Sequence, residues 1–273
     1  MVCSIECNSN CTLINMKMIK RVTLSLFNSL LYSSFAIAGW STPGNDFNGG
    51  IKFEGNVTNN RNPWEWKIMG KVFVPALNEN ARRGDNYWRV PVSSVTILSG
   101  KTSSTSPAGR QGLTPVIRLG KRGDKTKVEW TAPGIATVTL PVYGEEKEER
   151  GIFSFKIRAV ALMKHVTDGK VNYHSLYNNT SGNGLPDSNN LLEPSQAIGV
   201  LREIYNTEPL SWLSKDAVVS DKNSINALSD KSFRQVDGAY GAQIVQDSGV
   251  LIFTSRVAPD KWRVILPVSI EYQ

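Results

Sequence analysis

Residues 135–162 read IATVTLPVYGEEKEERGIFSFKIRAVAL and predict an antiparallel β-hairpin. Apolar residues recur at every second position on both sides of a charged run, which is the period of a strand with one buried face. The run of residues 144–151, GEEKEERG, is typical of a solvated hairpin tip rather than of paired catalytic carboxylates. Before the tip, the first strand buries either Ile135 or the face that carries Val138, Leu140 and Val142. After the tip, the second strand buries the face that carries Phe153, Phe155 and Ile157.

Several other segments carry the same strand pattern. Short alternating runs separated by glycine-rich or charged turns favour an antiparallel β-sandwich or barrel. The fold class predicted from the residues is therefore all-β. The segments are PWEWKIMGKVFV (63–74), VPVSSVTILSG (90–100), TPVIRLG (114–120), KVEW (127–130) and GAQIVQDSGVLIFTSRV (241–257).

The character of the chain changes between about residues 168 and 235. Residues 168–190 are rich in Asn, Ser and Gly and predict a long surface loop. Residues 191–206, LLEPSQAIGVLREIYN, have the apolar spacing of an amphipathic helix, and a second short helix is expected in 211–218 or 223–233. Such an insertion either builds a binding surface or covers an open sheet edge.

The first 38 residues are expected to be removed or to have no function. Residues 16–38 have a basic start, a broken apolar stretch and an Ala36-Ile37-Ala38 ending, which predicts an export signal cleaved before Gly39. Residues 1–15 then form a non-native or functionless extension, and the true start is Met1, Met16 or Met18. All three cysteines lie in that extension, so the exported protein is expected to contain no disulfide bond.

The composition and motifs argue against an enzyme, a metalloprotein and a nucleic-acid-binding protein. After residue 38 the chain has 28 basic and 23 acidic residues, a net charge of +5, with no basic stripe. It contains no phosphate-binding glycine loop and no metalloprotease or nucleophile-elbow motif. Its two histidines, His165 and His174, have no recognisable additional ligands, so we expect no catalytic residue, no metal and no cofactor.

Alternating apolar faces occur at both ends of the exported chain. Residues 46–57, DFNGGIKFEGNV, form one such segment, and it is followed by a polar stretch rather than by a turn. Residues 260–273, DKWRVILPVSIEYQ, form the other, with a proline at 267 that is tolerated mainly at a sheet edge. The apolar or small positions are Phe47, Gly49, Ile51, Phe53, Gly55 and Val57 in the first segment, and Trp262, Val264, Leu266, Val268, Ile270 and Tyr272 in the second.

The order of several short motifs resembles fimbrial subunits and adhesins of the kappa-class chaperone–usher systems of enterotoxigenic enterobacteria. The resemblance covers both ends and the first half of the exported chain, and it is weak from about residue 165 to 240. The motifs are DFNGG and WEWK near the start, SVTILSGK (94–101), GRQGLTPVIRL (109–119), LPVYGEEKEERGIFSFKIRA (140–159) and LPVSIEYQ (266–273).

This resemblance implies an immunoglobulin-like sandwich that lacks its last strand. The pilin domain is then residues 61–273 with the insertion at about 168–235, and residues 39–60 form a donor-strand extension. A periplasmic chaperone fills the groove first, and at an outer-membrane usher the extension of the next subunit replaces it by β-augmentation. The apolar face of 46–57 is the expected donor, and the face of 262–272 is the expected groove edge. The resemblance also implies that the protein is a subunit of a cell-surface fimbrium, in which neighbouring subunits form a non-covalent polymer.

Two questions remain open from the sequence. Residues 46–57 are either a donor strand or the first strand of a complete sandwich, and the second reading corresponds to a monomeric secreted lectin or hydrolase. A host glycoconjugate is a further expected partner, because aromatic faces and amides suit sugars. Its candidate contacts are Tyr173, His174, Tyr177 and Asn179.

Overall fold

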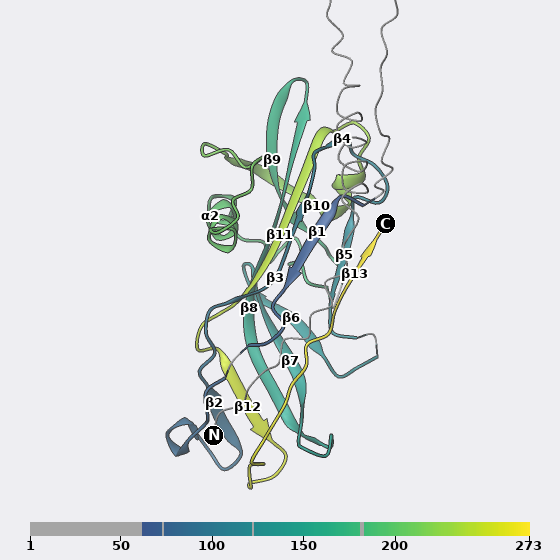
Figure 1. The fold of residues 1–273 in the computed structure, drawn as a ribbon. Coiled ribbons are helices and arrows are strands. Elements are labelled where there is room, and N and C mark those ends of the chain that lie inside the picture. Colours follow the sequence, from purple (N-terminus) through teal and green to yellow (C-terminus); the bar gives the residue numbers. More distant parts are fainter. Residues whose placement is uncertain (1–61, 73, 122, 181–182) are drawn as a thin grey trace, which may run out of the picture. The chain divides into compact units, whose positions relative to one another are not determined.

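A computed structural model describes residues 62–72, 74–121, 123–180 and 183–273. The chain divides into two compact units, Met1–Val57 and Thr58–Gln273, and all described residues belong to the second. Its regular secondary structure consists mainly of β-strands, as predicted (Figure 1). No helix among the described residues is long and apolar enough to cross a membrane.

The hairpin predicted from residues 135–162 forms the middle of the structure. Strand β7 (Ile135–Tyr143) pairs antiparallel with β8 (Glu149–Thr167), and Val138 lies opposite Phe155. The charged tip makes a tight turn in which Lys147 adopts a left-handed conformation with φ 66°. The buried face of β7 is the one that carries Val138, while Ile135 is only partly buried, which decides between the two faces that the sequence left open.

Strand β8 is long enough to organise the large sheet along both of its edges. β7 and β9 (Lys170–Tyr177) pair along one edge, and β11 (Arg234–Ile244) and β12 (Gly249–Phe253) pair along the other. The remaining strands of this sheet extend outward from these pairs. They are β1 (Trp64–Ile68), β2 (Tyr87–Val90), β3 (Thr96–Thr102), β4 (Ser106–Ala108), β6 (Lys127–Ala132) and β10 (Val219–Ser224).

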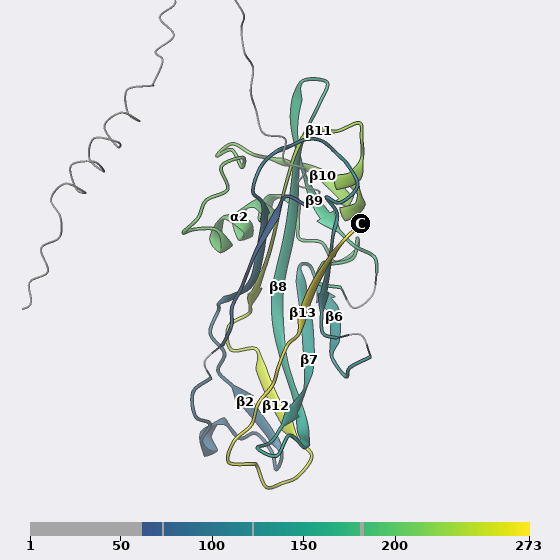
Figure 2. The ribbon, with the colours of Figure 1, turned by 45° about the vertical axis from the view of Figure 1, so that its right-hand side comes forward.

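A second sheet of two strands packs over the large one and completes a sandwich. It consists of β5 (Pro115–Leu119) and β13 (Val268–Tyr272), which pair antiparallel. Ile117 and Leu119 of β5 are buried in the same core as Leu140 and Phe155 of the central hairpin. This main core lies between the two sheets, and in both views the small sheet lies on the opposite side of the large sheet from helix α2 (Figures 1 and 2).

The insertion builds a second core on the other face of the large sheet. Helix α2 (Pro194–Ile204) begins with a proline, which suits the first turn, and it buries Ile198 and Leu201. These side chains pack against Val160 and Leu162 of β8. Residues 159–163 of β8 are therefore buried on both faces, which explains why this stretch of the strand is continuously apolar.

Several sequence predictions within this unit were wrong in detail. The expected loop of residues 168–190 contains strand β9, which pairs with β8 and, in parallel, with β10. The second short helix expected in 211–218 or 223–233 is present in the latter as the 3-10 helix η2 (Ile225–Ser229), while residues 211–218 contain turns. A further 3-10 turn, η1 (Glu79–Ala81), was not predicted.

Two expected strands are shorter than their alternating patterns. The segment 63–74 is a strand only over β1. In the segment 90–100, Val90 ends β2 and the next strand, β3, begins only at Thr96. In both cases the apolar pattern extends beyond the residues that have a pairing partner. Burial, which creates the pattern, and backbone pairing, which defines a strand, therefore end at different residues.

Candidate functional site

The C-terminal strand β13 is an edge strand. Its register with β5 places Val268 opposite Leu119, Ile270 opposite Ile117 and Tyr272 opposite Pro115. The pairing is extended by hydrogen bonds from the Gly120 amide to the Pro267 carbonyl (2.7 Å) and from the Gln273 amide to the Thr114 carbonyl (3.1 Å). Within the described part of the chain, β5 is the only strand that pairs with β13, so the outer edge of β13 has no neighbouring strand.

The inward face of the C-terminal segment is only half covered. Alternation predicted from the sequence is present along the whole segment, because every second residue from 262 to 272 packs against the main core. Each of these side chains nevertheless remains partly exposed, whereas Ile117 on the neighbouring strand is 1% exposed. Along this side, the described residues therefore cover the core only in part. The half-covered residues are Trp262, Val264, Leu266, Val268, Ile270 and Tyr272.

Strand β1 shows a matching gap in cover on the large sheet. Trp64, Trp66 and Ile68 share its inward parity, and β1 pairs with β3 alone among the described strands. Trp64 is 7% exposed, Trp66 is partly buried and Ile68 is 57% exposed, so cover decreases steadily along the strand. Beyond β1, Val72 and Val74 also pack against the main core without belonging to a strand.

We call the uncovered strip between these two edges the assembly groove. On one side it contains Trp64 and Trp66 of β1 with Val72, Val74 and Leu77 beyond that strand. On the other side it contains the half-covered residues of the segment 262–272, and both sets pack against the same core. One direct side-chain contact joins its two edges, because the indole nitrogen of Trp66 donates a hydrogen bond to the Tyr272 hydroxyl at 2.7 Å. The groove presents apolar side chains and strand edges, which are the features that a further β-strand requires.

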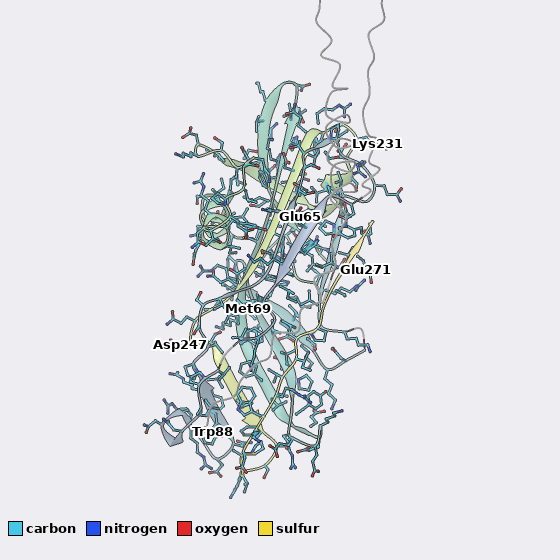
Figure 3. The ribbon with its side chains drawn as sticks, viewed as in Figure 1. Glu65, Met69, Trp88, Lys231, Asp247 and Glu271 are labelled. Atoms are coloured by element: carbon cyan, nitrogen blue, oxygen red, sulfur yellow. The ribbon has the colours of Figure 1, made fainter. Side chains whose placement is uncertain are left out.

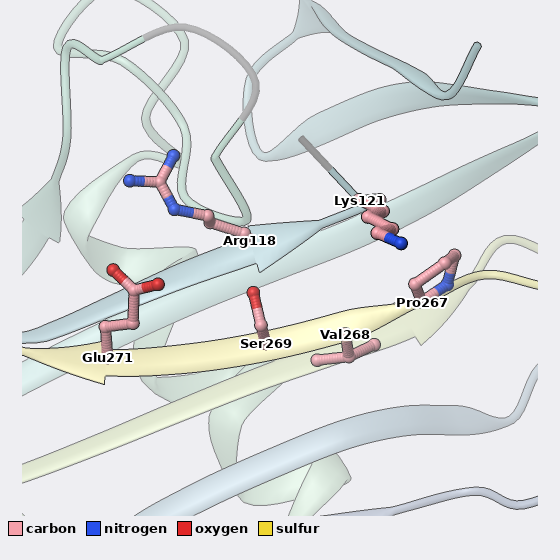
Figure 4. A pocket seen from close by; sticks show the side chains of 7 residues that line it. Arg118, Lys121, Pro267, Val268, Ser269 and Glu271 are labelled. Atoms are coloured by element: carbon pink, nitrogen blue, oxygen red, sulfur yellow. The ribbon is translucent and has the colours of Figure 1, made fainter. Parts of the chain in front are cut away.

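The outer face of the small sheet is polar. Ser269 and Glu271 point away from the core beside Arg118 of β5, around a shallow hollow of about 220 Å³ that Lys121 also lines (Figure 4). The small sheet therefore has one apolar and one solvated face. Glu65 of β1 and Glu271 of β13, both labelled in Figure 3, are likewise exposed to solvent.

The predicted sugar-contact residues do not gather at one place. Tyr173 is 7% exposed and belongs to the second core, where its hydroxyl donates to the Trp212 carbonyl at 3.2 Å. His174 is the next residue on the same strand and so faces the opposite side of the sheet. Tyr177 is partly buried and Asn179 is exposed. Sugar binding by these four residues stays a prediction, and of the four the Tyr173 ring is enclosed by protein.

The two histidines form part of a buried ring stack. The His165 ring stacks on His174 with centroids 5.0 Å apart, and on Phe233 at 3.8 Å. Burial is the main cause that lowers the pKa of both histidines, and for His165 the neighbouring His174 lowers it further. The Phe233 ring of this stack packs against the main core. No cluster of three or more metal-ligating side chains occurs in the described residues.

The expected donor residues lie outside the described residues. Phe47, Gly49, Ile51, Phe53, Gly55 and Val57 all precede residue 62. The sequence did not identify the opposite edge of the groove, although the alternation of Trp64, Trp66 and Ile68 was visible. The sequence alone could not show that Ile68 stays exposed, because its exposure depends on which strands lie beside β1.

Comparison with known proteins agrees with this architecture. Residues 17–273 match the family model described as fimbrial, major and minor subunit. The chain is also 42% identical over 256 residues to the K88 minor fimbrial subunit FaeI of Escherichia coli, an alignment that covers 93% of this chain and all of the relative. This chain therefore belongs to the K88 family of major and minor fimbrial subunits.

Proposed function

We propose that this subunit enters the fimbrium by donor-strand exchange through the assembly groove. The chain is exported to the periplasm by its 16–38 signal, where a chaperone strand fills the groove first. At an outer-membrane usher, residues 46–57 of the next subunit replace the chaperone strand, and the completed fimbrium mediates adhesion at the cell surface. Membership of a fimbrial subunit family supports the assembly with neighbouring subunits.

The observation that carries the proposal is the half-covered core between β1 and β13. A sandwich that folds by itself normally buries its inward face and protects its free edges. Here the outer edge of β13 is unpaired within the described residues, and the side chains beneath it remain partly exposed. One added strand would correct both defects, because it would pair with β13 and insert its own apolar face over the core.

Residues 46–57 have the pattern that such a strand needs. Phe47, Ile51, Phe53 and Val57 alternate with polar positions, and burying them contributes about 6–12 kcal/mol gross, at about 1.5–3 kcal/mol each. Main-chain hydrogen bonds to β13 add to this apolar contribution, as in other cases of β-augmentation. Neither the relatives nor the described residues support the alternative of a secreted lectin or hydrolase.

A double substitution in the donor segment tests the proposal in cells. Ile51→Asp with Phe53→Asp places two charges on the apolar face of the donor and leaves the groove unchanged. Co-expressed with the cognate chaperone, the variant should still form chaperone complexes but should no longer form multimers. Unchanged multimers would refute the role given to this segment, and loss of the chaperone complex would show that the substitutions disrupt folding instead.

A further inference from the structure

The hydrogen bond between Trp66 and Tyr272 connects two strands that have no backbone contact with each other. Trp66 lies on β1 at the edge of the large sheet, and Tyr272 lies on β13 at the edge of the small sheet. The distance of 2.7 Å from the indole nitrogen to the hydroxyl oxygen is that of a well-formed hydrogen bond. The two residues are 206 positions apart in the chain, so the bond fastens the C-terminal end to the start of the domain.

The Trp66 ring is held in place independently of this bond. It stacks on Trp64 with centroids 5.3 Å apart and an interplanar angle of 17°, and it leans on Tyr240 at 5.9 Å. Beneath it lies Gly100, where an added Cβ would come within 2.3 Å of the indole. The indole nitrogen is therefore oriented by packing, so the hydroxyl meets a donor that is already in position.

Trp64 makes an equivalent connection to the other strand of the small sheet. Its indole nitrogen donates to the Leu113 carbonyl at 2.8 Å, two residues before β5 begins. The stacked indoles thus join β1 to β13 and to the segment that leads into β5, at the same end of the sandwich. At the other end of β1, Ile68 is 57% exposed, so the connections are concentrated where the groove is best covered.

We propose that Trp66 and Tyr272 are positioning residues that hold the end of β13 against the large sheet before a chaperone strand fills the assembly groove. This inference rests on the proposed function, because it assumes a state in which the groove has no occupant. A strand that fills the groove pairs with β13 along its length and itself joins the two sheets. The side-chain bond is then one connection among many, so its contribution is largest before the incoming strand arrives.

Amide hydrogen exchange in β13 tests this directly. The background is the full exported chain with Ile51→Asp and Phe53→Asp, so that copies cannot fill one another's grooves. Exchange of residues 268–273 is measured alone and with a saturating synthetic peptide of residues 46–57. The variants are Tyr272→Phe, Trp66→Phe and the double variant. The matched control is Tyr87→Phe on β2, because this strand pairs with β12 of the large sheet and not with the small sheet.

Each single variant should increase the exchange of β13 in the empty protein by about 2- to 13-fold, the range expected for one net hydrogen bond. The double variant should exchange no faster than the faster single variant, because both remove the same bond. Exchange in β12 and in the Tyr87→Phe control should not change. With the peptide bound, the difference between the variants and the background should disappear.

Three results would overturn the inference. Unchanged exchange in the empty protein, additive effects in the double variant, or an equal increase in β12 would each show that the bond does not specifically position β13. Failure of the background protein to bind the peptide is a different outcome, since it contradicts donor-strand exchange. The comparison of variants in the empty protein would then still decide whether the bond holds β13.

Discussion

Replacing Ile270 by alanine should weaken donor-strand binding, whereas the same substitution at its cross-strand partner Ile117 should not. Ile270 faces the main core from β13 and is partly exposed, whereas Ile117, directly opposite on β5, is 1% exposed. Truncating a fully buried isoleucine to alanine costs about 2–5 kcal/mol. We expect about half of this, ~1–2.5 kcal/mol, for Ile270→Ala in the empty subunit, and the full cost once a donor strand covers it.

The difference between the two states appears as lost affinity for the donor. A difference of about 1–2.5 kcal/mol corresponds to about 5- to 70-fold weaker binding of a peptide of residues 46–57. Ile117→Ala removes the same atoms from a site that is buried in both states, so it should lower stability and leave peptide affinity nearly unchanged. The assay is peptide titration monitored by fluorescence anisotropy, combined with urea unfolding of each variant without peptide.

The result that would refute this reasoning is equal behaviour of the two variants. If Ile270→Ala left peptide affinity unchanged, the incoming strand would not cover β13, and the exposed face would need another explanation. If Ile117→Ala weakened the peptide as strongly, the effect would come from general loss of the fold. Only a selective loss at Ile270 supports a groove that is completed from outside.

Three further predictions concern the rest of the domain. Burial lowers the pKa of His165 and His174 below the unfolded value of about 6.5. Their contribution to stability is therefore complete above pH 6.5 and is lost as the pH falls below it. Urea midpoints measured from pH 7.5 to 4.5 should fall, and His165→Phe should reduce that fall. Leu201→Ala in α2 removes a fully buried side chain from the second core and should cost about 2–5 kcal/mol, seen as faster amide exchange in the helix before the main core unfolds. Asp237→Ala leaves Lys164, which is 3.0 Å away and 15% exposed, without its buried partner, and should cost about 3–5 kcal/mol in equilibrium unfolding, whereas an exposed control such as Glu145→Ala should cost under ~1 kcal/mol.

The sequence predicted those parts of the fold in which burial and pairing coincide. The hairpin of β7 and β8 was recognised because its alternating faces lie within paired strands and its charged tip is a turn. The helix at 194–204 was recognised for a similar reason, since its apolar stripe packs directly onto the sheet. In these elements the local pattern and the tertiary packing impose the same structure.

The sequence could not predict elements that depend on distant partners. Strand β9 has a polar composition, KVNYHSLY, and forms because β8 continues past the sandwich and offers it an edge. The C-terminal segment alternates from 262 onward but becomes a strand only from Val268, after Pro267, which has no amide hydrogen to donate. For the proposed groove, the sequence pattern predicted one edge, residues 262–272, and the exposure of Ile68 beside the other edge required the structure.

An engineered disulfide bond tests the central claim, that the groove of one subunit is filled by residues 46–57 of another. All three natural cysteines lie in the first eleven residues, so a chain that begins at Gly39 has no thiols. Ile51→Cys in the donor is combined in turn with cysteine at Val264, Leu266 or Val268 inside the groove, and with Ser269→Cys on the outer face as the control.

If residues 46–57 fill the groove of another subunit, at least one of the inner positions should give a ladder of covalent multimers on non-reducing gels of oxidised fimbriae. Ser269→Cys should not. A crosslink formed only within single chains would contradict this prediction, because residues 46–57 would then complete their own sandwich.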